Sequence, residues 1–317
     1  MSFIHRYRSW GVVAFCIAIL LVYALFLAPS SAFPKDALVE IKKGTALPDI
    51  AQQLYQAHIV AHPDLLRLIL RIDGSGGTVQ AGRYLFRDPQ NVFTVAYRLA
   101  SGSYDIPPVR ITYPEGTTVR DMAEITASST AFIKPAVFIA TAKNYEGYLF
   151  PDTYLFPPDA TADSIVETMR ANFDTKTGPL HAQVRASAHS LSDIVTMASL
   201  IEKEARTTVN RKLVAGVLWN RITKGMPLQV DAVFGYIYNR DTYSPSFADL
   251  TVSSPYNTYT HVGLPPGPID NPGLDSLQAA LNPTPSKYLY YLTDREGVMH
   301  YATTYAEHQA NQNKYLH

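Results

Sequence analysis

The 317-residue sequence contains a single cysteine, Cys16. One cysteine cannot form an intramolecular disulfide, so no disulfide framework holds this fold together. The sequence also has no excess of either charge, because 27 lysines and arginines balance 27 aspartates and glutamates. Without a global positive field the chain does not attract nucleic acid, and we expect no nucleic-acid partner.

The short motifs of several common enzyme classes are missing as well. The sequence has no HExxH, no pair of CxxC motifs, no phosphate loop and no GxSxG elbow. The glycines at 74–77, GSGG, lie in a predicted turn with no helix after it, unlike a dinucleotide-binding loop. These absences argue against metal-dependent, nucleotide-dependent and serine-hydrolase chemistry. We expect no metal and no organic cofactor.

Tyrosine, in contrast, is abundant, with 21 tyrosines against 2 tryptophans. A tyrosine ring has a flat apolar body and a polar tip, which suits core edges and carbohydrate grooves alike. The hydrophobic content of 47% is high enough to fill a core. At this length the chain is predicted to form one large domain or two to three smaller ones.

One long apolar run lies near the N-terminus. Residues 10–27, WGVVAFCIAILLVYALFL, carry no charge, and this is about the minimum length of a membrane-spanning helix. Arg6 and Arg8 precede the run, and the positive-inside bias would keep them in the cytoplasm. The small residues SSA at 30–32 leave a cleavable signal peptide as the alternative.

The run is longer than the core of ~7–15 residues that signal peptides have, which favours an uncleaved anchor. We therefore predict a cytoplasmic segment over residues 1–9, a transmembrane anchor over 10–28 and a linker over 29–37. Everything after the anchor would face the periplasm.

Two later segments resemble each other at an offset of 72 residues. Gly44 and Gly116 each begin a similar stretch, GTALPDIA and GTTVRDMA, between a predicted strand and a predicted helix. Two copies indicate a duplicated small module, not a solenoid. We predict a small α+β module over 38–106 and a larger α+β domain over 107–317, opening with a partial second repeat at 109–145.

The segment LSDIVTMASLIEKEA, residues 191–205, is predicted to be a helix with two glutamates near its end. At about 100° per residue, the apolar side chains define a buried face, and Glu202 and Glu204 fall on its two borders. Partial burial raises the pKa of a carboxyl group and can keep it protonated as a general acid. The alternative is a solvated helix end whose glutamates pair with Lys203, Arg206 and Arg211. Helical geometry does not separate Glu202 from Glu204.

Two segments rich in polar and aromatic residues follow this helix. In LQVDAVFGY, Gln229 and Asp231 alternate with apolar residues, which predicts that both project from one face of a short strand. In SPYNTYTHVGLPPGPI, Tyr256, Asn257 and Tyr259 offer stacking surface and hydrogen-bonding groups. A groove for a glycan needs such side chains, although ordinary turn chemistry is an equal explanation for Asn257.

These segments resemble the MltG, or YceG-like, family of endolytic murein transglycosylases. The resemblance follows the family order along the chain, through KKGTALPDIAQQLY, AGRYLF, EGYLFPDTYLF, MASLIEKEA, VAGVLWNRITKGMPLQVDAVFGY, SPYNTYTHVGLPPGPIDNPGLDSLQAALNP and YLYYLTDREGVMHYATTYAEH. It implies a single-pass inner-membrane protein with a LysM-like module and a periplasmic YceG-like catalytic domain.

The resemblance also implies an activity and partners. Family members cleave the MurNAc–GlcNAc β-1,4 bond inside nascent peptidoglycan strands, leaving 1,6-anhydro-MurNAc ends and ending strand elongation. The implied partners are the glycan strands, the inner membrane and the peptidoglycan synthases. The reaction is a lyase step that uses no cofactor.

By resemblance, the second glutamate of EKE, Glu204, is the acid/base, and Glu202 is a supporting residue or the alternative catalyst. The residues expected to line the glycan groove are Gln229, Asp231, Tyr256, Asn257 and Tyr259. The chain departs from some relatives at Ala205, where a threonine can stand, but this change removes no catalytic group.

Two other functions remain open from the sequence. A hydrolytic muramidase would need a second carboxylate, and Asp231 is the nearby candidate. A non-catalytic glycan-binding scaffold would need no acid at all, and the retained EKE triplet argues against it.

Overall fold

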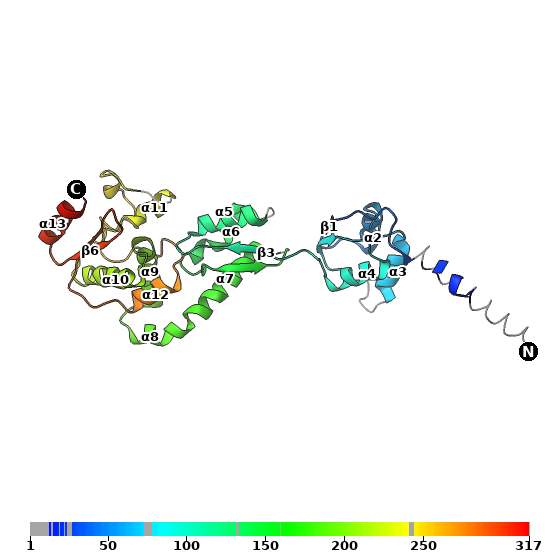
Figure 1. Cartoon of the computed structure of the whole chain (residues 1–317), viewed down its shortest axis with the longest axis horizontal. Coiled ribbons are helices and arrows are strands. Elements are labelled where there is room, and N and C mark those ends of the chain that lie inside the picture. The colour runs from blue at the N-terminus through cyan, green and yellow to red at the C-terminus, as the bar shows by residue number, and fades with distance from the viewer. Residues whose placement is uncertain are drawn as a thin grey trace, which may run out of the picture. The chain divides into compact units, whose positions relative to one another are not determined.

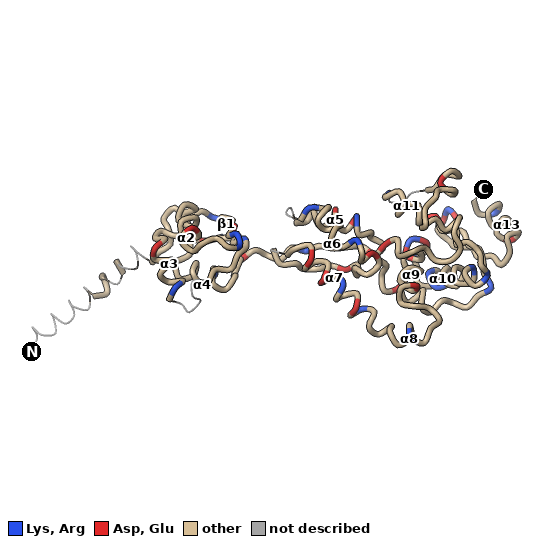
Figure 2. The backbone as a smooth tube through the Cα atoms, turned by 180° about the vertical axis from the view of Figure 1, so that it is seen from behind, with Lys and Arg blue, Asp and Glu red and all other residues tan. Residues whose placement is uncertain are grey.

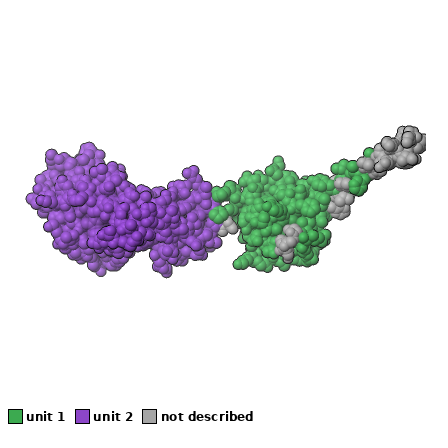
Figure 3. All heavy atoms as spheres, turned by 90° about the horizontal axis from the view of Figure 1, so that it is seen from below, with its two compact units in different colours: residues 1–108, 157–159 green, residues 109–156, 160–317 purple. Residues whose placement is uncertain are grey.

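The computed structural model divides the chain into two compact units, coloured separately in Figure 3. Unit 1 contains residues 1–108 and 157–159, and unit 2 contains residues 109–156 and 160–317. The structure describes residues 13, 15–18, 20–21, 23, 27–72, 78–130, 133–158, 160–240 and 244–316. Both units mix helices with short antiparallel strands, which confirms the predicted α+β class.

Unit 1 is a two-stranded sheet covered by helices (Figure 1). Strand β1 (Ala37–Ile41) pairs with β2 (Gly82–Phe86) in a register that sets Ala37 opposite Phe86. Its helices are α2 (Leu47–Gln56), α3 (Pro63–Ile72) and α4 (Val92–Ser101). Their apolar faces enclose a core that contains Leu54, Leu66, Tyr84, Phe86 and Leu99.

Unit 2 opens with a similar arrangement. Strand β3 (Val109–Thr112) pairs antiparallel with β4 (Thr153–Phe156). The turn before α5 (Val119–Thr130) contains Gly116 at φ 75°, just as Gly44 precedes α2 at φ 87°. A left-handed backbone at both positions explains why each copy of the repeat begins with glycine.

Two further helices complete this part of unit 2. Helix α6 (Pro135–Ala142) packs against both α5 and α7 (Ala162–Thr177). The segment between α6 and β4 contains Gly147 and Pro151, which disfavour a regular helix, and it forms only the short 3-10 helix η2 (Lys143–Tyr145).

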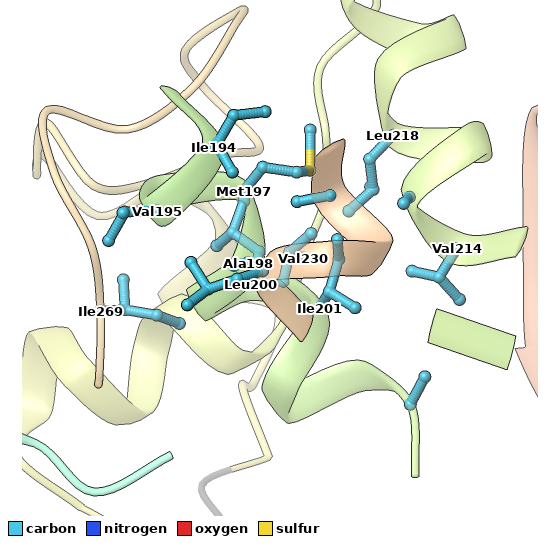
Figure 4. Close-up of a cluster of buried hydrophobic side chains, with 14 of the residues drawn as sticks. Ile194, Val195, Met197, Ala198, Leu200, Ile201, Val214, Leu218, Val230 and Ile269 are labelled. Atoms are coloured by element: carbon cyan, nitrogen blue, oxygen red, sulfur yellow. The ribbon is translucent and has the colours of Figure 1, made fainter. Parts of the chain in front are cut away.

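The second part of unit 2 is built around α9 (Leu191–Glu204). A capping box formed by Ser190 and Asp193 starts the helix. Every residue from 194 to 201 is buried, because α10 (Thr208–Thr223) and α12 (Leu274–Leu281) pack against α9. Figure 4 shows the α9 side chains meeting Val214 and Leu218 of α10 and the loop residues Val230 and Ile269.

The remaining elements of unit 2 are short. They are η3 (Gly178–Leu180), α8 (His181–Ala186), α11 (Ala232–Tyr238), η4 (Asp249–Thr251), β5 (Tyr290–Thr293), β6 (Met299–Ala302) and α13 (Tyr305–Tyr315). Strands β5 and β6 form an antiparallel hairpin. Residues 294–297, which lie between them, are typical of a tight turn and predict this hairpin from the sequence.

One sequence-based prediction is wrong. Gln229 and Asp231 do not lie on a strand: Gln229 has a left-handed backbone with φ 52°, and Asp231 is the residue before α11. The only pairing nearby in the described chain is an isolated bridge between Pro227 and Val262. The alternation of polar and apolar residues there comes from a loop that crosses buried Leu228 and Val230.

Nine of the 19 residues of the predicted anchor, 10–28, lie outside the described residues. Within the described part of the chain, no helix has the length and apolar character needed to cross a membrane.

Candidate active site

A cavity of about 690 Å³ opens in unit 2 beside the C-terminal end of α9. Its walls come from the start of α5, from η2, from α11 and from the loops around residues 254–256 and 269. The lining side chains include Arg120, Asp121, Lys143, Glu146, Lys203, Glu204, Asp231, Tyr236, Arg240 and Tyr256. The cavity therefore combines several acids, several bases and two tyrosine rings.

Glu204 is the last residue of α9 and lines this cavity. The buried part of α9 fixes the backbone of Glu204, while the end of the helix brings its carboxyl group to the cavity wall. The hydroxyl of Tyr291, from β5, donates a hydrogen bond of 2.8 Å to Glu204 Oε2. This contact joins residues 87 positions apart in the chain.

Burial, with a smaller contribution from the negative charge of Asp231, raises the pKa of Glu204 to about 7. The hydrogen bonds from Tyr291 and from the backbone N–H of Ala232 act in the opposite direction. A helix C-terminus also carries a partial negative charge, which disfavours a carboxylate there. A carboxyl group with this pKa can give and take a proton near neutral pH.

Glu202 occupies a different environment, away from the cavity lining. Arg211 Nη2 donates a 2.6 Å hydrogen bond to its Oε1, and the backbone N–H of Gly273 donates one of 3.0 Å to its Oε2. The Glu202 side chain is 6% exposed, and Arg211 also binds Asp275 at 2.9 Å. Glu202 thus ties α9 to α10 and to the N-terminus of α12, which is a structural role.

Asp231 and Tyr256, two of the predicted groove residues, line the cavity together with Glu204. The hydroxyl of Tyr259 donates a 2.5 Å hydrogen bond to Asp231 Oδ1, so Tyr259 orients a cavity carboxylate without lining the cavity itself. The ring of Tyr256 lies 5.0 Å from that of Tyr236, and the pair forms an aromatic wall.

The structure places the other two predicted groove residues outside the cavity lining. Asn257 is fully buried: its amide donates to the carbonyls of Leu250 and Val252 and accepts from the N–H of Tyr259. Gln229 accepts a 3.3 Å hydrogen bond from Arg221. Both side chains shape the loops that border the site.

Glu146 is a cavity residue that the sequence reasoning missed. Its Oε1 accepts hydrogen bonds from the N–H of Val119, at 3.0 Å, and from Asn271 Nδ2, at 2.9 Å. Burial raises its pKa to about 7. The next residue, Gly147, has φ 84°, and a Cβ there would collide with Pro268 and lie 2.8 Å from Val195 Cγ1. Only glycine fits such a position, so the Glu–Gly pair was the feature of the sequence that could have pointed to Glu146.

Asp270 is a second buried acid near the cavity wall. It is 0% exposed, and neither of its carboxyl oxygens has a hydrogen-bond partner in the described structure. Burial raises its pKa well above the ordinary value, while the charge of Lys203 lowers it. Burial therefore favours a neutral Asp270 beside the site. In the described part of the chain, no three His, Cys, Asp or Glu side chains form a group suited to a metal ion.

Comparison with known proteins identifies the family to which the chain is similar. The profile of the YceG-like family matches residues 39–314. A protein of Bacillus subtilis (strain 168) named endolytic murein transglycosylase is 30% identical over 305 residues, covering 88% of this chain and 84% of that protein. A protein of the same name from Streptococcus pneumoniae (strain D39) is 30% identical over 319 residues.

The alignment with the S. pneumoniae protein covers 87% of this chain and 58% of that relative, so the chain spans little more than half of its length. Among solved structures, the 2.6 Å crystal structure of a yceG-like protein from Listeria monocytogenes matches with a TM-score of 0.60 and 30% identity. That match covers 87% of this chain and 99% of the other.

Proposed function

The chain belongs to the YceG-like family, and we propose that it is an endolytic lytic transglycosylase of peptidoglycan. In this proposal it cleaves the MurNAc–GlcNAc β-1,4 bond inside glycan strands and leaves 1,6-anhydro-MurNAc ends. The observation that carries the proposal is the Glu204 carboxyl group, which lines a 690 Å³ cavity and has a pKa of about 7. The names of the relatives support the same reaction.

The proposed reaction needs one acid/base group. Protonated Glu204 gives its proton to the glycosidic oxygen as the bond from that oxygen to the anomeric carbon breaks. The resulting carboxylate then takes the proton of the MurNAc C6 hydroxyl while that oxygen bonds to the anomeric carbon. Glu204 ends protonated again, no water is consumed, and the nucleophile is part of the substrate.

Asp231 has a separate role in this scheme. Positive charge develops at the anomeric carbon as the bond breaks, and a carboxylate held by Tyr259 in the same cavity can stabilise that charge. The same residue supports the alternative activity, a hydrolytic muramidase, in which a second carboxylate activates water or traps the sugar. The two activities differ in their products.

The test is mass spectrometry of the fragments that the full-length protein in detergent releases from purified peptidoglycan, with Glu204→Gln and Glu202→Gln run alongside. We expect anhydro-ended fragments from the wild type and a loss of about 10²-fold or more for Glu204→Gln, since glutamine cannot transfer the proton. The folded fraction of Glu202→Gln should keep most of the activity. Reducing ends would identify a muramidase, and no release from the wild type would favour a glycan-binding scaffold.

We also propose that residues 10–28 anchor the chain in the inner membrane, with residues 29–317 in the periplasm beside the peptidoglycan synthases. The support comes from the uncharged run over 10–27 and the two arginines that precede it. In this arrangement residues 38–106 would act as a LysM-like module on newly made strands, next to the catalytic domain at 107–317.

A further inference from the structure

The cavity holds more positive charge than the cleavage reaction uses. Four basic side chains line it, Arg120, Lys143, Lys203 and Arg240. The scheme above assigns no role to any of them, because the glycosidic bond and the C6 hydroxyl are both neutral. A neutral glycan backbone would not need this charge.

Two of these bases lie on the α5–α6 side of the cavity. Arg120 is the second residue of α5, and Lys143 directly follows α6, which packs against α5. Both side chains are exposed to solvent, and neither has an ion pair or hydrogen bond within the described residues. The positive charge of Arg120 acts on Tyr236 of α11, across the same cavity. Figure 2 shows basic positions at the ends of these two helices.

The acids of the cavity are already engaged. Asp121 accepts a 2.7 Å hydrogen bond from Thr118 Oγ1, Glu146 accepts from Val119 and Asn271, and Asp231 accepts from Tyr259. Glu204 is bound by Tyr291 and has a pKa of about 7. Arg120 and Lys143 therefore face a concave surface on which the acids have other hydrogen-bond partners and none of the described acids is paired to these two bases.

We propose that Arg120 and Lys143 form a binding site for an anionic substituent of the glycan strand. This inference rests on the proposed function and specifies its substrate: a substituted strand, not bare glycan. Two parts of peptidoglycan carry suitable anions, the carboxylates of the peptide stems and the diphosphate at the reducing end of a lipid-linked growing strand. Guanidinium and ammonium groups bind both chemistries through charge-assisted hydrogen bonds.

The test measures the affinity of strands for the full-length protein carrying Glu204→Gln, so that binding is read without cleavage. The comparison is between that protein and the same protein with Arg120→Gln and Lys143→Gln added. Three ligands are used: soluble stem-bearing strands, the same strands freed of peptides by an amidase, and lipid-linked strands. The matched control replaces two exposed bases outside the cavity, Lys134→Gln and Arg185→Gln.

We expect the Arg120 and Lys143 replacements to weaken binding of stem-bearing strands about tenfold or more and to leave peptide-free strands unaffected. Weakening confined to lipid-linked strands would assign the site to the diphosphate. Equal weakening for all three ligands, no weakening, or the same loss in the matched control would overturn the proposal. Because affinity is measured without turnover, these outcomes stay distinct from a failure of the wild type to cleave.

Discussion

Glu202 and Glu204 are separated in the structure by partners that are distant in sequence. Arg211 and Gly273 bind both oxygens of Glu202, whereas Tyr291 binds one oxygen of Glu204 and leaves its carboxyl group at the cavity. One glutamate therefore holds helices together, while the other faces the space where a substrate can bind.

The hydrogen bond from Tyr291 predicts a specific change in pH dependence. The pKa of Glu204 is about 7, above the ordinary 4.5, so the acid form that protonates the glycosidic oxygen is lost as pH rises through about 7. Tyr291 stabilises the carboxylate and lowers that pKa, so Tyr291→Phe should raise it. We expect the alkaline limb of the pH–rate profile to move up by about one pH unit.

The measurement is the initial rate of strand cleavage from pH 5 to 9 for the wild type and Tyr291→Phe. Tyr290→Phe is a neighbouring control, because that hydroxyl is not bound to Glu204. An unshifted limb with a uniformly lower rate would mean that Tyr291 serves only in packing.

At the scale of elements, α9, α10 and α12 are held together by an ion-pair group as well as by apolar packing. Arg211 lies between Glu202 and Asp275, and its side chain is 11% exposed. Replacing one partner of a buried ion pair leaves an uncompensated charge, which costs more than the pair itself contributes.

Arg211→Met should therefore lower the unfolding free energy of unit 2 at pH 7 by about 3 kcal/mol. Adding Glu202→Gln should recover part of that loss, because the stranded carboxylate is then neutral. The measurement is urea unfolding followed by the fluorescence of Trp219 in α10, in a Trp10→Phe background that leaves a single tryptophan. Additive effects of the two substitutions would show that the pair is not coupled.

The helices and strands were easier to predict from the sequence than the residues that line the candidate active site. The apolar spacing over residues 191–205 was sufficient to predict α9, and the turn at 294–297 was sufficient to predict the β5–β6 hairpin. The environment of Glu204 was not predictable, because it depends on Tyr291 and Asp231, which only the tertiary fold brings close to it. Asn257 was expected in the groove, but a buried asparagine that satisfies three backbone groups gives the same polar signal in a sequence.

At the scale of the whole molecule, each unit has its own buried core. The cores of unit 1 and unit 2 share no residue, and unit 2 has separate clusters around α5–α7 and around α9. Under the proposed function, the catalytic chemistry lies within unit 2, which holds Glu204 and its cavity.

The proposed anchor gives a prediction for the whole chain. Full-length protein should pellet with membranes and stay there through washes with high salt and with sodium carbonate, which remove peripheral proteins. A variant that lacks residues 1–28 should appear in the soluble fraction. Release of the full-length protein by either wash would contradict a spanning helix.

The burial of α9 on all sides links the position of Glu204, the proposed acid/base, to the stability of the fold. Glu204 is the continuation of a helix whose residues 194–201 are all enclosed, so it is not carried by a loop that can melt separately. Conditions that displace Glu204 must first open the packing of α10 and α12 around that helix. Loss of the proposed activity on heating should therefore coincide with the cooperative unfolding of unit 2, so that the protein is either folded and active or unfolded and inactive.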